Sequence, residues 1–142
     1  MTYIPVNFRE ANTILFNLLS SKSTYKVEFG KFGKFPMDAP SIVIFSKPAS
    51  NEVEGKEINY LLKYYDIAKF TIFALDYMKE DMVESIANTI DMLENILDII
   101  TKNATFQYII PEGAISFDDA YDNNLVVSYF EFYIPYKRKY QV

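Results

Sequence analysis

The sequence predicts an α+β fold of two layers, in which one long helix packs on a mixed or antiparallel sheet of about four to five strands. Apolar residues recur at helical spacing over 82–100, and they alternate with a period of two over 64–76 and 125–134. The expected order of elements is α-β-β-β-α-β-β. With 142 residues, half of them hydrophobic, the chain is expected to form a single domain over residues 1–142.

The first helix and the first two strands are expected before residue 46. Segment 7–20 has apolar residues at helical spacing, and Asn7 followed by Glu10 resembles a capping box. Apolar runs at 25–29 and 41–45 predict strands, and the second is apolar enough to lie centrally in the sheet. The connection between them, GKFGKFPMDAP at 30–40, is rich in turn residues.

The segment KPASNEVEGKE at 47–57 is polar and contains Pro48 and Gly55. It is predicted to be an exposed loop or the tip of a long hairpin. A loop of this length in a compact domain is more often functional or disordered than a plain connector.

The third strand, at about 64–76, is expected to lead directly into the second helix. Phe70, Ile72 and Ala74 are predicted to point to one side of the sheet, and the residues between them to the other. The helix is expected to begin near Asp76–Met78, with Asp76 as its N-cap. Its predicted core stripe is Val83, Ile86, Ile90, Leu93, Leu97 and Ile100. Further apolar residues at 82, 87, 96 and 99 widen this stripe, which favours a helix on a sheet over a coiled coil.

Two closing strands are predicted. The first is Phe106–Ile110, which is followed by Pro111 and Gly113. The second is 125–134, with one face formed by Val126, Ser128, Phe130, Phe132 and Ile134. Because proline cannot donate a hydrogen bond to a ladder, Pro135 is expected at a sheet edge.

Composition excludes several kinds of site. Without cysteine or histidine, the chain has no disulfide, no thiolate metal site and neither the commonest general base nor the commonest transition-metal ligand. The net charge is −5, and Arg9 and Arg138 are the only arginines, which argues against broad binding to nucleic acid.

Twelve Tyr and twelve Phe suit either a core or an oligomer interface. No apolar run is long enough to span a bilayer, and an unexported protein that contacts no membrane is expected.

Four polar or charged segments are candidate sites. GKFGK at 30–34 lacks the first glycine and the Ser or Thr of a phosphate-binding loop, which favours a turn. FDDAYDNN at 117–124 groups Asp118, Asp119 and Asp122, but it departs from the common calcium loop at Ala120, which favours a solvated turn between strands. YKRKY at 136–140 fits a nucleic-acid strand, an acidic partner or a charged edge that blocks strand pairing. The helix also carries a polar stripe that suits a solvated face or a surface that repels DNA: Glu84, Asn88, Asp91, Asn95 and Asp98. None of these supports a catalytic residue or a cofactor, and no enzyme activity is expected.

The element order, together with DIAKFTIFALDYMKEDMVESIANTIDMLENIL at 66–97 and FDDAYDNNLVVSYFEFYIPY at 117–136, resembles the tail terminator (tail completion) proteins of long-tailed bacteriophages. The resemblance is architectural and covers most of the chain. It implies a homo-hexameric ring in the virion, assembled in the host cytoplasm. The ring would cap the tail tube and join it to the neck or connector protein, and DNA would pass through its lumen without specific binding.

The resemblance also implies contact surfaces. The loop between the second and third strands is expected to touch the tail tube protein through Lys47, Ser50, Asn51, Glu52, Glu54, Lys56 and Glu57. Subunit or neck contacts are expected from Phe32, Lys34, Phe35, Lys137, Arg138, Lys139 and Tyr140.

Three other functions stay open from the sequence. The chain fits another neck or tail-tube component of a phage. It also fits a small dimeric α+β module that binds a ligand or regulates a partner, with aromatic residues lining a pocket. An enzyme that holds a divalent metal through Asp118, Asp119 and Asp122 is the third.

Overall fold

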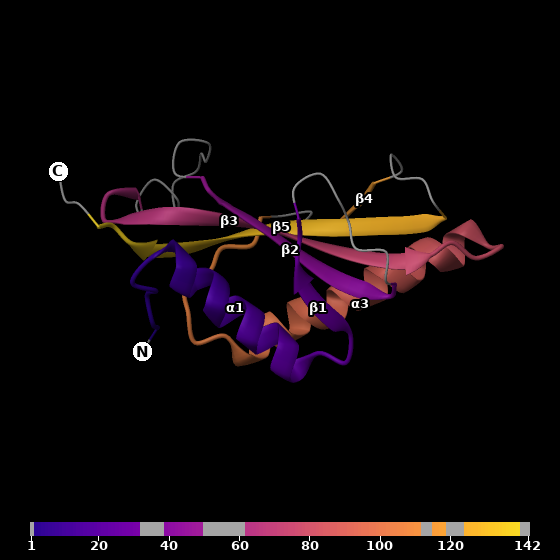
Figure 1. Ribbon diagram of the computed structural model, residues 1–142, viewed down its shortest axis with the longest axis horizontal. Coiled ribbons are helices and arrows are strands. Elements are labelled where there is room, and N and C mark those ends of the chain that lie inside the picture. The colour runs from indigo at the N-terminus through magenta and orange to yellow at the C-terminus, as the bar shows by residue number, and fades with distance from the viewer. Residues whose placement is uncertain (1, 32–38, 50–61, 112–114, 119–123, 140–142) are drawn as a thin grey trace.

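The computed structural model describes residues 2–31, 39–49, 62–111, 115–118 and 124–139. It has the predicted α+β fold, with a five-stranded mixed sheet in the order β1-β2-β3-β5-β4 and two helices on one face (Figure 1). The elements are α1 (Phe8–Lys22), β1 (Lys26–Phe29), β2 (Ser41–Pro48), β3 (Tyr65–Tyr77), α3 (Met82–Asn103), β4 (Ser116–Asp118) and β5 (Leu125–Lys137). The α-β-β-β-α-β-β order is confirmed.

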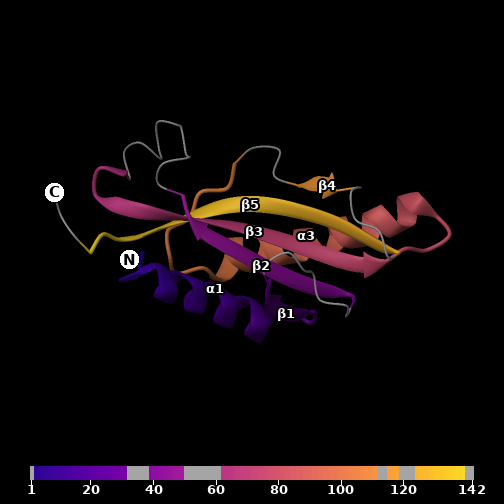
Figure 2. The same ribbon diagram turned by 45° about the horizontal axis from the view of Figure 1, so that its top comes forward.

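Two long strands form the centre of the sheet. β3 and β5 are each 13 residues long and pair antiparallel from Tyr65↔Lys137 to Tyr77↔Leu125. β2 pairs antiparallel with the other edge of β3, whereas β1 pairs parallel with β2 and makes the sheet mixed. In Figure 2, α1 lies beneath this curved sheet and α3 passes behind it.

The main core lies between the sheet and the two helices. Alternation along β3 and β5 sends Phe70, Ile72, Phe130 and Phe132 to this side, where all four are fully buried. The rings of Phe70 and Phe132 stack across the two strands with centroids 5.4 Å apart. The predicted faces of both strands are therefore confirmed.

The first helix begins where the sequence predicts. The Asn7 side chain accepts a hydrogen bond of 2.8 Å from the Glu10 backbone N–H. The Glu10 carboxylate turns back as in a capping box, but it accepts from the Val6 N–H at 3.3 Å and from the Tyr3 hydroxyl. The same contact ties the N-terminal segment to α1.

The predicted start of the second helix is wrong. Asp76 lies in β3, paired with Val126, and Asp81 is the N-cap of α3. The Asp81 carboxylate accepts from the N–H groups of Val83 and Glu84 at 2.9 and 3.4 Å. The strand continues through Asp76 because β5 supplies a ladder partner up to Tyr77.

The predicted core stripe of α3 is also shifted at its N-terminal end. Met82 is 61% and Val83 75% exposed, whereas Ser85 and Thr89 are completely buried. The small polar residues face the sheet, and the Thr89 hydroxyl lies 2.8 Å from that of Ser128 on β5. Small side chains let this part of the helix approach β5 closely, whereas Met82 and Val83 lie in the first turn of α3 and are exposed.

The predicted strand at Phe106–Ile110 is wrong. This segment makes two isolated bridges, Tyr3↔Phe106 and Ile109↔Tyr133, and the buried Phe106 ring joins the main core. The sixth element is instead β4, in a region expected to be a turn, where Ser116 pairs with Tyr129 of β5. The edge of β5 that faces away from β3 can pair with another segment near Tyr129 and near Tyr133. The sequence does not show which segment pairs at which of these two places.

β5 lies between β3 and β4 in the sheet, but Pro135 lies beyond the stretch that pairs with β4. The N–H groups of Tyr133 and Lys137 point away from β3 and donate to the carbonyls of Ile109 and Pro5, at 2.9 and 2.8 Å. Pro135 lies between them and shares their orientation in the strand. Its missing N–H therefore removes no hydrogen bond from the β3–β5 ladder.

Candidate functional site

The loop expected to touch a tube protein begins at the end of β2. Lys47 lies in that strand, exposed, and its Cα is paired with that of Lys69. Ala49 donates a backbone hydrogen bond of 2.9 Å to the Ile67 carbonyl. The other residues named for this contact lie outside the described residues: Ser50, Asn51, Glu52, Glu54, Lys56 and Glu57.

Four of the residues expected at subunit or neck contacts also lie outside the described residues: Phe32, Lys34, Phe35 and Tyr140. The other three, at 137–139, lie at the end of β5. Lys137 is exposed and belongs to the strand, and Lys139 is exposed just beyond it.

Arg138 makes its contacts within the chain. Its guanidinium donates to the Asp66 carboxylate at 3.2 Å and to the carbonyls of Leu62 and Tyr65 at 2.6 and 3.2 Å. The side chain is 29% exposed. It fixes the start of β3 against the end of β5, and its charge is paired with that of Asp66.

The start of β3 and the end of β5 form one surface, which we call the basic end: Val6, Lys63, Tyr64, Lys137, Arg138 and Lys139. Val6 belongs to it because the neighbouring Pro5 carbonyl accepts from the Lys137 N–H. Tyr64 is 59% and Val6 47% exposed. The surface therefore combines exposed apolar side chains with cationic ones.

The opposite end of the two long strands carries an apolar cluster at the junction of β3 and α3. We call it the apolar end: Tyr77, Met78, Met82 and Val83, with Glu80 and Glu84 beside them. The four apolar residues are between 48% and 75% exposed. In Figure 1 the start of α3 lies at the right of the molecule and the end of β5 at the left.

Sequence reasoning missed the apolar end because it assigned Met82 and Val83 to the core stripe. The sequence feature that indicates an exposed apolar surface on this helix is the width of that stripe. Apolar residues at 82, 83, 86, 87 and 90 cover more of the helix circumference than one sheet contact needs.

The face of the sheet opposite the helices is rich in aromatic rings. The Phe45 and Phe73 centroids are 5.4 Å apart, and those of Phe73 and Tyr129 are 5.5 Å apart. Further along the same face, Lys69 and Glu131 form an ion pair of 3.4 Å. Part of the aromatic content therefore packs against itself on this second face, outside the helix-covered core.

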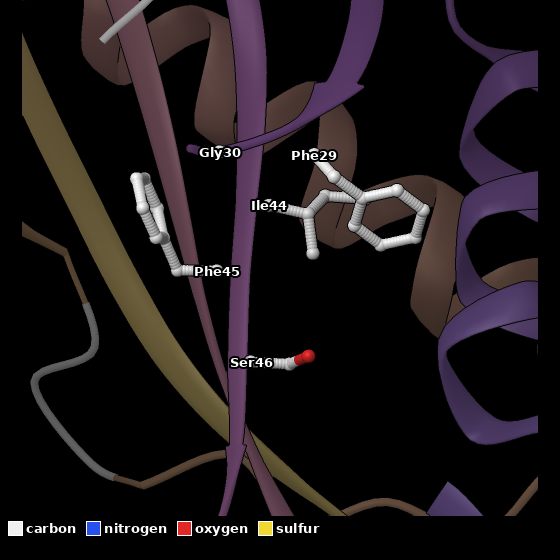
Figure 3. Close-up of a pocket in the computed structure, with 5 residues that line it drawn as sticks. All are labelled: Phe29, Gly30, Ile44, Phe45 and Ser46. Carbon is white, nitrogen blue, oxygen red and sulfur yellow. The ribbon is translucent and has the colours of Figure 1, made fainter. Parts of the chain in front are cut away.

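A hollow of about 230 Å³ lies where β1 ends beside β2, lined by Phe29, Gly30, Ile44, Phe45 and Ser46 (Figure 3). Gly30 continues the β1 pairing by donating to the Ile44 carbonyl at 2.9 Å. A Cβ added at Gly30 would lie 2.1 Å from Phe45 Cζ. The glycine is needed for ring packing at this point. The Ser46 hydroxyl at the rim donates to the side-chain oxygen of Asn12.

The structure describes one of the three aspartates that could hold a metal. Asp118 lies in β4 and pairs with Val127, whereas Asp119 and Asp122 lie outside the described residues. Within the ranges that the structure describes, no three carboxylates gather in a way that could hold a metal ion.

The polar stripe of α3 faces away from the sheet, with Glu84, Asp91, Asn95 and Asp98 exposed. Asp98 pairs with Lys102 one turn later at 2.9 Å. This is the pattern of a solvated helix face.

Two tyrosine hydroxyls have shifted pKa values. The hydrogen bond to Glu10 raises the pKa of Tyr3, and partial burial and the negative charge of Glu10 add to the effect. Burial raises the pKa of Tyr136, and the nearby Asp66 carboxylate raises it further.

No protein-family model matches the sequence, and no curated protein matches it significantly. Among the described residues, no helix has the length and apolar character needed to cross a membrane.

Proposed function

We propose that this protein is a structural component of a long-tailed phage virion, forming a homo-hexameric ring that terminates the tail tube and joins it to the neck or connector. The observation that supports the proposal is the order of elements along the chain. An N-terminal helix, three strands, a helix that follows the third strand closely and two closing strands are the architecture that the resemblance requires.

Assembly is also supported by the surface of the chain. The two ends of the sheet carry exposed apolar and charged side chains. A function that consists of binding other proteins uses such surfaces, because apolar burial supplies most of the free energy of association. The partners in this proposal are further copies of the chain, the tail tube protein and the neck or connector protein.

DNA is expected to pass through the ring without specific binding. The net charge of −5 and the exposed acidic residues of α3 both oppose attraction of phosphates. A virion location follows from the same proposal, with assembly in the host cytoplasm.

The test is imaging of the purified chain with tail tubes of its phage by negative-stain electron microscopy. Rings of this chain at one end of each tube, and an arrest of tube growth, are expected. Tubes that bind no chain and continue to grow would overturn the proposal.

A loop variant sharpens this experiment. Replacing Glu52, Glu54 and Glu57 with Gln is expected to weaken tube binding, because the resemblance assigns the tube contact to this loop. A matched control carries Asp91→Asn and Glu94→Gln on the exposed face of α3 and is expected to bind tubes like the unmodified chain.

The hollow beside β1 gives little support to the alternative function, a small ligand-binding module. Its volume of about 230 Å³ lies below the roughly 300–1,000 Å³ of typical ligand pockets. A saturable rise in melting temperature with one compound of a metabolite panel would favour this alternative.

A further inference from the structure

Exposed apolar side chains are concentrated at the apolar end. Four of the nine exposed large hydrophobic residues of the described chain occur between Tyr77 and Val83. Val83, at 75%, is the most exposed of the nine, although it lies in the first turn of a helix that packs on the sheet. A cluster of this kind on a folded domain marks a contact surface.

The charges beside this cluster are mostly negative. Glu80 and Glu84 are exposed at its rim, and Asp81 caps the helix between them. Lys79 is the one cation of the segment 77–84. A partner for this surface therefore needs an apolar centre and a basic rim.

The basic end of the same chain has that chemistry. Tyr64 and Val6 are 59% and 47% exposed and provide the apolar area. Lys63 and Lys137 are exposed beside them, while Arg138 is held by Asp66. The two surfaces are thus complementary in both charge and apolar character.

One copy cannot bring its own two ends together. β3 connects them, with Tyr65 at the basic end and Tyr77 at the apolar end. At about 3.3 Å per residue, its 13 residues separate the two surfaces by roughly 40 Å. The complementary surface must come from a second copy.

We propose that the apolar end of one copy docks on the basic end of the next, with Met82 and Val83 packing on Tyr64 and Val6. Glu80 and Glu84 then face Lys63 and Lys137 across the rim. The contact is head-to-tail, so each copy uses both of its ends, and it closes into a ring where the rotation between copies allows. As a subunit contact of a ring it rests on the proposed function.

Two double variants test the contact, because the altered side chains are exposed and their replacement leaves the core intact. The first, Met82→Gln with Val83→Gln, changes the apolar end. The second, Lys63→Glu with Lys137→Glu, changes the basic end. Sedimentation velocity over a range of concentrations measures association, and each change is expected to weaken it by about tenfold or more.

Mixing the two variants separates a head-to-tail contact from a symmetric one. Each variant keeps one intact end, so an equimolar mixture is expected to form heterodimers and to stop there. If the Lys63→Glu, Lys137→Glu variant alone dimerises as strongly as the unmodified chain, the contact joins two apolar ends and the proposal is wrong.

Disulfide trapping gives a second measurement, since the chain has no cysteine. Val83→Cys mixed with Tyr64→Cys is expected to give cross-linked heterodimers under mild oxidation, and more of them than either variant gives alone. An unmodified chain that stays monomeric, together with a mixture that yields no heterodimer, would overturn the proposal. Binding of these variants to tail tubes is measured separately. If the variants bind tubes but form no cross-link, this contact is rejected. If they form the cross-link but bind no tubes, the proposed function is rejected.

Discussion

Thr89 of α3 and Ser128 of β5 share a buried hydrogen bond of 2.8 Å between their hydroxyl oxygens. Thr89 Oγ1 also donates to the Ile86 carbonyl at 2.8 Å, which assigns Ser128 as the donor between the two hydroxyls. Both side chains are completely buried. The bond joins α3 directly to β5 inside the core.

The first prediction concerns this pair. Thr89→Val keeps the shape of the side chain but leaves the Ser128 hydroxyl buried without an acceptor, so it should lower the free energy of unfolding by about 1–3 kcal/mol. Ser128→Ala should cost less. The double variant should cost less than the sum of the two, because no polar group is then stranded. Urea denaturation of the four chains measures this, and strict additivity would contradict the coupling.

The second prediction concerns the start of α3. Asp81→Ala should lower the free energy of unfolding by about 0.5–2 kcal/mol, since it removes the acceptor of two backbone N–H groups. Asp76→Ala is the matched control and should cost less, because the Asp76 carboxylate accepts from the adjacent Tyr77 N–H within a strand and caps no helix. Chemical denaturation compares them, and the reverse order would place the cap at Asp76.

The third prediction concerns Arg138. Arg138→Met keeps much of the apolar stem but removes the hydrogen bonds to Asp66 and two carbonyls, and should cost about 1.5–3 kcal/mol. Arg138→Lys should restore only part of this, because an ammonium group lacks the planar fork that reaches three acceptors. Hydrogen exchange should show faster exchange at the start of β3. Full rescue by lysine would show that charge alone matters.

The fourth prediction concerns Gly30 and Phe45. Gly30→Ala places a Cβ within 2.4 Å of three atoms of the Phe45 ring and should cost about 1–3 kcal/mol as the ring moves. The same change in a Phe45→Leu background should cost less, since leucine does not reach as far. Equal costs in both backgrounds, measured by thermal unfolding, would contradict the steric explanation.

The fifth prediction concerns alkaline pH. The raised pKa of Tyr136 means that the unfolded chain loses this proton first, near its ordinary value of 10.0. Stability from this group is complete below that pH and declines as the pH rises toward the folded-state pKa. Tyr136→Phe should therefore make the loss of stability above pH 10.0 less steep. Tyr64→Phe, at an exposed position, serves as the control, and identical slopes for all three chains would contradict the assignment.

Local sequence patterns correctly predicted the faces of the two long strands and the N-cap of the first helix. Alternation identified the faces of β3 and β5, because side chains of a strand point alternately to its two sides whatever the partner strand is. The Asn7 cap could also be predicted from local sequence, because its acceptor and its donor are only three residues apart. The contacts of Arg138 were not predicted, because sequence proximity does not reveal that it binds Asp66, 72 residues away.

Local sequence patterns predicted the fold class and the order of elements, and the composition excludes cysteine and histidine chemistry. Tertiary structure decided where β3 ends, which segment forms β4, and that Met82 and Val83 face outward. These features depend on partners distant in the chain. β5 extends β3 through Tyr77, and Thr89 of α3 contacts Ser128 of β5, which lies 39 residues away in the sequence.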